Sequence, residues 1–234
     1  MLRKIIEKSR RIVFFGGAGV STASGIPDFR SPDGLYAGDF DGLTPEMILS
    51  KSFFYLHPAR FFDFYRRRMV YPNARPNAAH LKLYEWERQD KLRGIVTQNI
   101  DGLHKLAGNR RVYEIHGSVH DNACMDCGAA YPLQAVLDAA DIPRCPKGGG
   151  VIKPSVVLYG EAPDKYVCMG ATREISGADT LIVAGTSLSV EPAASFLEYF
   201  SGKNLVVINR EPTPADSRAS LVIRDDVAKV MAAL

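Results

Sequence analysis

The sequence predicts an α/β fold of the doubly wound class, in which helices cover both faces of a parallel β-sheet. Short, almost continuously apolar runs recur along the chain, and stretches with helical spacing separate them. Strands that are apolar on both sides are typical of a parallel sheet buried between two layers of helices. Glycines follow the first of these runs directly, as they do at the strand-to-helix turns of this fold class.

Five strands are expected from the apolar runs. They are "RIVFF" at 11–15, "GIVTQ" at 94–98, "VYEI" at 112–115, "TLIVAG" at 180–185 and "NLVVIN" at 204–209. A helix is expected to begin at Thr44-Pro45-Glu46, since threonine caps helices, proline suits the first turn and glutamate complements the helix dipole. Aromatic residues follow at roughly helical spacing, and we expect them to be packing residues: Phe53, Phe54, Phe61, Phe62 and Phe64.

The segment from about residue 118 to 153 interrupts the alternation of strands and helices. It is rich in glycine and proline and carries three of the four cysteines. We therefore expect a small module inserted into the main fold. The predicted organisation is a Rossmann-like domain formed by 1–37, 90–117 and 154–234, a helical insert at 38–89 and a zinc-ribbon-like insert at 118–153.

Composition excludes several classes of protein. The chain has 234 residues, of which 46% are hydrophobic, and its basic residues exceed its acidic residues by only three. Outside Arg66-Arg67-Arg68 the basic residues are scattered, so neither nucleic acid nor membrane is an expected partner. The apolar runs near the N-terminus are too short for a signal peptide or a membrane span, and a cytoplasmic location is expected. In that setting the cysteines are metal ligands or free thiols rather than disulfides.

The stretch "GGAGVSTASGIPDFR", Gly16 to Arg30, has the composition of a phosphate-binding loop. Glycines let the backbone approach a diphosphate, and a following helix N-terminus offers unpaired N–H groups. The match to G-x-G-x-x-G lacks its third glycine, so a tight strand-to-helix turn is the alternative. In the irregular loop that follows, Arg30 could neutralise phosphate and Phe29 could cover a sugar face, unless Asp28 and Arg30 pair with each other.

Polar side chains follow the second and third predicted strands. Gln98, Asn99 and Asp101 end one strand, and His116 ends the next. Ligands of open parallel sheets bind beyond the carboxyl ends of the strands, so these residues are expected to lie together. A lone histidine is more often structural, but this alignment favours His116 as a general base. Later strand ends add further hydrogen-bonding groups, namely Thr186, Ser187 and Asn209.

These segments resemble the signature blocks of the sirtuin family. The blocks are "GAGVSTASGIPDFR", "TQNIDGLH", "EIHGS", "CPKGGGVIKPSVVLYGE", "GTSLSVEPA" and "VINREPTP", in the family's order over nearly the whole chain. The resemblance is greatest to the compact bacterial members. It implies an NAD-dependent enzyme that removes acyl groups from protein lysines and yields nicotinamide and an O-acyl-ADP-ribose.

The resemblance also implies roles for individual residues. Those implied to hold NAD are Gly17, Ala18, Gly19, Thr22, Asp28, Phe29, Arg30, Gln98, Asn99, Ile100, Asp101, His116, Gly185, Thr186, Ser187, Asn209 and Asp226. His116 is implied to deprotonate a ribose hydroxyl, and Asn99 to position ribose and water. Those implied to sandwich an acyl-lysine peptide as an added strand are Val156, Val157, Leu158, Tyr159, Leu188 and Val190.

Family members commonly hold a structural zinc with two C-x-x-C pairs. Cys124, Cys127 and Cys145 match three of these ligands, whereas Gly148 stands at the fourth position. Structural zinc is almost always four-coordinate, so either another group completes the shell or the metal is weakly bound or absent. His120, Asp126, a water or a partner's residue could complete it, whereas Cys168 belongs to a separate predicted helix.

The sequence leaves alternatives open for the acyl group that is removed and for the type of reaction. Tyr65-x-x-Arg68 matches a pair that reads the carboxylate of succinyl or malonyl groups in some sirtuins, although this stretch otherwise resembles members that favour acetyl groups. A mono-ADP-ribosyltransferase or a non-catalytic NAD-binding module would use the same cofactor site. A zinc-ribbon reader of nucleic acid is disfavoured by the incomplete cysteine set and the low charge.

Overall fold

Six parallel strands form the main sheet of the computed structural model, which describes residues 1–29, 31, 34–35, 40, 42–191 and 193–234. Every neighbouring pair is parallel. The strand order is β3 (Val112–Glu114), β2 (Leu92–Thr97), β1 (Ile12–Gly16), β7 (Thr180–Ala184), β8 (Asn204–Ile208) and β9 (Leu221–Ile223). The doubly wound class and the five predicted strands are thus confirmed. The sixth strand, β9, was not predicted; it is a three-residue strand at the edge of the sheet.

Helices cover both faces of this sheet. All five residues of β1 are buried, and their side chains alternate between two hydrophobic clusters. Val13 and Phe15 face the cluster that includes α8 (Lys165–Ser176), whereas Ile12 and Phe14 face the cluster that includes α1 (Leu2–Lys8), α5 (Ala78–Arg88) and α9 (Val227–Ala232). Because the side-chain period of a strand is two, a strand that feeds two cores must be apolar throughout.

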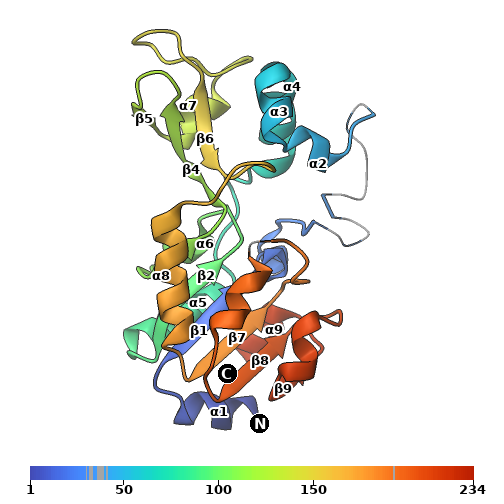
Figure 1. The fold of residues 1–234 in the computed structure, drawn as a ribbon, viewed down its shortest axis with the longest axis vertical. Coiled ribbons are helices and arrows are strands. Elements are labelled where there is room, and N and C mark those ends of the chain that lie inside the picture. Colours follow the sequence, from blue (N-terminus) through green and yellow to red (C-terminus); the bar gives the residue numbers. More distant parts are fainter. Residues whose placement is uncertain (30, 32–33, 36–39, 41, 192) are drawn as a thin grey trace.

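A second, smaller sheet is antiparallel, with strand order β5 (Ala130–Tyr131), β4 (Gly117–Cys124) and β6 (Ile152–Val156). It carries α7 (Leu133–Leu137) and lies at the opposite end of the molecule from the parallel sheet, as Figure 1 shows. The chain enters it through Gly117, which has φ +75° and whose added Cβ would lie 1.7 Å from the Ser155 carbonyl oxygen. Only glycine fits at this crossing.

The first part of the predicted helical insert, 38–89, packs beside the small sheet (Figure 1), whereas α5 at its end packs on the parallel sheet. This first part comprises α2 (Pro45–Ile48), α3 (Lys51–Leu56), α4 (Pro58–Phe64) and a π-helical turn, Tyr65–Met69. The predicted cap is present, since the Thr44 side chain accepts from Met47 N. The predicted aromatic packing is confirmed, because four of the five phenylalanines are buried and Phe53 packs against the same cluster.

The two inserted segments therefore share one hydrophobic cluster, which includes residues of both β4 and α4. Together they form what we call the small lobe, residues 43–70 and 118–158. The remaining short helix, α6 (Leu103–Leu106), follows the end of β2 in the main fold. Across the described ranges, no helix has the length and apolar character needed to cross a membrane.

Candidate active site

A pocket of about 680 Å³ lies at the carboxyl ends of the parallel strands, between the main sheet and the small lobe. Its wall includes residues that follow β1, β2, β3, β7 and β8 as well as residues of the small lobe. This is the place where open α/β sheets bind ligands. The volume falls within the range of cofactor-binding pockets.

The glycine loop after β1 forms one wall of the pocket. Its backbone is bonded to the loop after β7, since Gly17 N donates to Ala184 O and Gly19 N donates to Gly185 O. The contact leaves no space for side chains: a Cβ on Gly17 would lie 2.7 Å from the Gly185 oxygen, and one on Gly19 would lie 2.8 Å from the Gly185 Cα. Glycine is thus required here for close packing of two loops.

The α-helix expected directly after this loop is not present, and that expectation was wrong. Two short 3-10 turns, Ala18–Val20 and Thr22–Ser24, stand in its place, and Gly25 ends them in the left-handed region at φ +81°. The backbone turns tightly because Thr22 Oγ1 donates to Gly19 O and Gly25 N donates to Thr22 O. Both Ala18 and Thr22 line the pocket.

A hydrogen-bonded chain joins the loop after β1 to the end of β2. Ser21 Oγ donates to Asp101 Oδ2 at 2.6 Å, and Asn99 Nδ2 donates to Ser21 Oγ at 3.0 Å. Ser21 and Asn99 are buried, so both side chains are held in fixed positions. The sequence argument did not single out Ser21. Its only signal was its place inside the glycine-rich block.

His116 lies at the end of β3 with its ring fixed by the neighbouring strand. Its Nδ1 lies 3.0 Å from the Gln98 carbonyl oxygen. A carbonyl oxygen can only accept, so the neutral ring carries its proton on Nδ1 and presents Nε2 as the basic nitrogen. Burial lowers the pKa of His116, and the bond to Gln98 partly opposes this. The imidazole is therefore neutral near pH 7, the state a general base requires.

The end of β7 connects to the same cluster. Gln98 Nε2 donates to Thr186 Oγ1 at 3.0 Å, and the same hydroxyl accepts from Leu188 N at 3.1 Å. Thr186 thereby ties the β2 end to the turn after β7, in which Gly185 and Leu188 both have positive φ. Ser187 lines the pocket beside it.

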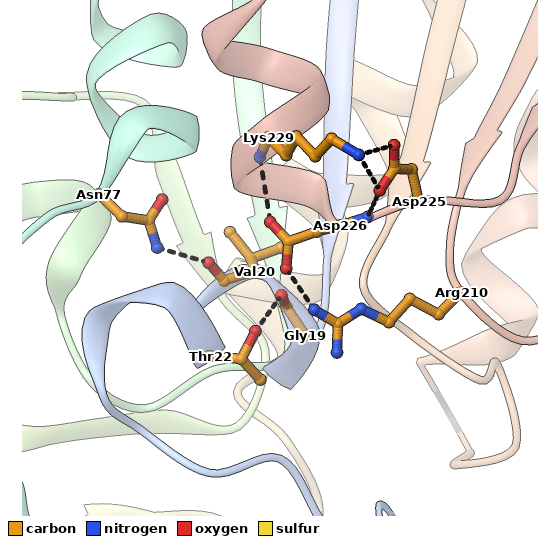
Figure 2. Close-up of polar contacts among 8 residues, drawn as sticks. All are labelled: Gly19, Val20, Thr22, Asn77, Arg210, Asp225, Asp226 and Lys229. Atoms are coloured by element: carbon orange, nitrogen blue, oxygen red, sulfur yellow. Dashed lines mark hydrogen bonds and ion pairs between the residues drawn. The ribbon is translucent and has the colours of Figure 1, made fainter.

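Residues that follow β8 and that begin α9 also line the pocket. Figure 2 shows the polar contacts of two of them, Arg210 and Asp226. Asp226 Oδ1 accepts from Lys229 N, which caps α9, while Asp226 Oδ2 accepts from Arg210 at 2.8 Å. Asn209 also lines the pocket, and its Nδ2 donates to Glu211 O. Arg210 was missed from sequence, although it follows Asn209 directly.

The loop after the 3-10 turns contributes Asp28 and Phe29 to the pocket. Asp28 Oδ1 accepts from Ser31 N at 2.8 Å, so this carboxylate fixes the turn of its own loop. Arg30, predicted to contact phosphate or to pair with Asp28, lies outside the described residues.

Most of the predicted peptide-binding residues line the pocket. Val156, Val157, Leu158, Tyr159 and Val190 do so, whereas Leu188 is buried in the core of the main fold. Val157 N donates to His116 O at 2.9 Å, which links this segment directly to the predicted base. Tyr159 exchanges two backbone bonds with the helical insert, through Lys51 N and Leu49 O.

The structure does not bring Tyr65 and Arg68 together in the pocket. Arg68 lines it, but Tyr65 is fully buried, stacks on Phe61 with ring centroids 5.7 Å apart, and is not among the lining residues. Burial raises the pKa of Tyr65 far above its usual range. The π-helical turn explains the divergence, because its i→i+5 bonds spread residues three apart farther round the axis than an α-helix does.

Three thiols meet in the small lobe, away from this pocket. The Sγ atoms of Cys124, Cys127 and Cys145 lie within 4.8 Å of one another, and all four cysteines are free thiols. The Cys127 and Cys145 sulfurs are 3.8 Å apart. Two thiolates on a tetrahedral zinc, each about 2.3 Å from the metal, would be separated by about 3.8 Å. The donor set and its spacing therefore fit zinc, and the metal would stabilise the small lobe.

The donor groups of the pocket suit a dinucleotide. A glycine turn permits close approach of a diphosphate, and the amide and hydroxyl groups of Gln98, Asn99 and Thr186 suit ribose and carboxamide partners. A fixed neutral imidazole lies among them. The fold and the pocket thus define an α/β enzyme of the dinucleotide-binding class.

Comparison with known proteins identifies the family. Residues 17–192 match the model of the Sir2 family, so the chain belongs to the Sir2 family, the sirtuins. It is similar to the NAD-dependent protein deacetylase of Clostridium perfringens (strain 13 / Type A), with 53% identity over 98% of this chain and 95% of the relative.

Solved structures of Sir2 proteins have the same fold. One is a Sir2 histidine-to-alanine variant with a deacetylated p53 peptide and 3′-O-acetyl ADP-ribose, with TM-score 0.91, 34% identity and coverage of 98% of this chain and 94% of that one. Another is a Sir2 homologue in complex with NAD, with TM-score 0.90, 36% identity and coverage of 99% and 90%.

Proposed function

We propose that this protein is an NAD-dependent protein lysine deacetylase, which transfers the acetyl group of a lysine to ADP-ribose and releases nicotinamide. Membership of the Sir2 family supports this proposal. The observation that carries it is the cluster of His116, Asn99 and Asp101 at adjoining strand ends, in one pocket with the glycine loop. A non-catalytic NAD-binding module would not need a neutral, oriented imidazole there.

NAD supplies the reactive sugar, because breaking its nicotinamide–ribose bond develops positive charge on the anomeric carbon. The glycine loop, Thr22 and Thr186 would hold the phosphates and the adenosine side. Asp101 would bind the carboxamide, and Ser21 keeps its carboxylate oriented. Phe29, on the wall of the pocket, would exclude water from the reacting centre. Such positioning lowers the barrier by holding the reactants in the attacking geometry.

His116 would act as the general base. Its Nδ1–H is held by the Gln98 carbonyl, so Nε2 would accept the proton of a ribose hydroxyl. Since burial keeps the pKa of His116 below its usual value, the rate should stay constant above about pH 6.5, the ordinary pKa of histidine, and fall only at lower pH.

The substrate would enter beside the segment Val156–Tyr159 as an added strand. Tyr159 already bonds to the helical insert through both its N–H and its C=O. The backbone of Leu158 is also engaged, since Leu158 N donates to Glu161 Oε2 and Leu158 O accepts from Glu161 N. A peptide would therefore bond to other backbone groups of this segment and to those near Val190. Backbone pairing of this kind gives affinity with little demand on the substrate's sequence.

Nicotinamide release with an acetyl-lysine peptide tests the proposal. The wild-type protein should release nicotinamide and deacetylate the peptide in equal amounts, as mass spectrometry of the peptide and nucleotide would report. His116→Ala should lower the rate about 100-fold to 10,000-fold. The matched control is His57→Ala, because His57 is exposed on the helical insert. A peptide that gains ADP-ribose and keeps its acetyl group would instead indicate a mono-ADP-ribosyltransferase.

A second activity, on succinyl- or malonyl-lysine, has one observation in its favour. Arg68 lines the pocket and could meet a carboxylate. Its neighbours on the wall, Met69 and Val70, are apolar, and Tyr65 does not reach the pocket. We therefore expect acetyl-lysine to be preferred, and Arg68→Met to lower any activity on succinyl peptides while leaving acetyl peptides unaffected.

A further inference from the structure

The three-cysteine cluster lacks one ligand for a four-coordinate metal. Gly148 occupies the position of the missing cysteine, is exposed, and has nothing within 4 Å of where its Cβ would lie. The surrounding turn is nevertheless intact, since Cys145 N donates to Gly150 O and Gly149 N donates to Cys145 O. The backbone turn that follows Cys145 is thus kept, although Gly148 offers no ligand atom.

We propose that the carboxylate of Asp126 completes this site, so that the chain binds a divalent zinc-like metal through three thiolates and one carboxylate. A Cβ added to the buried Gly150 would lie 2.5 Å from Asp126 Oδ2 and 2.8 Å from Cys124 Sγ. The carboxylate and the first thiol therefore lie against the same face of Gly150. Because Gly150 has no side chain, the Asp126 carboxylate and the Cys124 thiol both have space there.

The position of Asp126 in the chain supports this assignment. It lies between Cys124 and Cys127 in the C-x-x-C turn and is exposed, so its side chain can change rotamer without disturbing the core. In its present rotamer the carboxylate is not among the groups that cluster within 4.8 Å of one another. To complete the shell, the carboxylate would move closer to the three thiols. Carboxylate oxygen is an accepted zinc ligand, and it carries the same charge as the missing thiolate.

The other candidates for a fourth ligand lie elsewhere or are already used. His120 Nε2 is bonded to Asp101 O at 3.1 Å, and its ring packs on Gly102. Cys168 packs against the core of the main fold. Tyr131 OH lies 2.9 Å from Cys145 Sγ and would donate to that sulfur, which orients a ligand rather than replacing one. Asp126 is the acidic side chain that lies with Cys124 against Gly150.

Cobalt titration of the full-length chain tests the proposal, because Co²⁺ bound by thiolates in a tetrahedral site has characteristic absorbance. The wild type should bind one Co²⁺ per chain. Asp126→Ala should weaken binding at least about 10-fold, and Asp126→Cys should keep tight binding with a fourth thiolate band. Asp138→Ala is the matched control, since Asp138 is an exposed aspartate of the same lobe whose carboxylate bonds to Gln134.

Two outcomes would overturn the proposal: a wild-type chain that binds no Co²⁺, or an Asp126→Ala variant that binds it as tightly as the wild type. Misfolding of Asp126→Ala is controlled by combining it with Gly148→Cys. If that double variant binds Co²⁺ through four thiolates while the single variant does not, the loss is that of a ligand and not of the fold.

Discussion

Two buried histidines should make this protein unstable in mild acid. His80 and His104 are almost fully buried in the main fold, with ring centroids 4.7 Å apart. His80 Nδ1 accepts from Asn77 N at the start of α5, but its Nε2 and both nitrogens of His104 have no partner among the described residues. Neither ring can be charged without a large loss of hydration.

The pKa shifts give the sign and the size of the effect. Burial lowers the pKa of His80 from 6.5 to about 4, although the nearby Asp101 carboxylate opposes the shift, and burial lowers the pKa of His104 as well. Above pH 6.5 the histidine is neutral in both the folded and the unfolded chain. Between pH 6.5 and 4 the unfolded chain binds a proton that the folded chain does not. His80 alone should then lower the free energy of unfolding by about 2 kcal/mol at pH 5 and about 3 kcal/mol at pH 4.

Urea unfolding at pH 7.5, 6, 5 and 4.5, followed by circular dichroism, measures this loss. His80→Gln should reduce the pH dependence by the stated amount, because glutamine has no titrating ring and can still accept from the Asn77 N–H. His57→Gln, which replaces an exposed histidine, should leave the pH dependence unchanged. If His80→Gln loses stability with falling pH as steeply as the wild type, then His80 is not the group that titrates, and the reasoning is refuted.

Two further predictions concern the pocket and the junction of the lobes. Ser21→Ala removes the hydrogen bonds of Ser21 to Asp101 and Asn99. At about 1 kcal/mol each, their loss should lower kcat/KM for nicotinamide release about 10-fold to 30-fold. An unchanged kcat/KM would show that these hydrogen bonds are not needed for activity. Gly117→Ala should lower the free energy of unfolding by more than about 3 kcal/mol, because its Cβ would overlap the Ser155 backbone. Gly128 also has positive φ but has open space around it, so Gly128→Ala should lower the free energy of unfolding by only about 1 kcal/mol. Equal losses of stability in Gly117→Ala and Gly128→Ala would contradict the steric argument.

The strands and the outline of the active site were predictable because they depend on local patterns. A strand buried on both faces must be largely apolar, as β1 is throughout and β7 is after Thr180, and a parallel sheet presents its carboxyl ends at one edge. That rule alone brought Gln98, Asn99, Asp101 and His116 together in the prediction. The edge strand β9 was not predicted, although β3 at the other edge is equally short and was.

Only the tertiary structure decided how the side chains meet. Two 3-10 turns replace the helix expected after the glycine loop, and Gly17 and Gly19 of that loop pack against Gly185, a contact between distant segments. The pairing of Ser21 with Asp101 spans 80 residues, and no local spacing reports it.

The sequence by itself determined the layers of the fold, the edge of the sheet where the pocket lies and the family to which the chain belongs, since each follows from apolar periodicity, strand polarity or local residue blocks. The tertiary structure decided that Tyr65 is buried while Arg68 reaches the pocket, and that Asp126 lies with Cys124 against Gly150. Such choices depend on side-chain direction and on contacts between segments far apart in the chain, and neither is encoded in spacing along the sequence.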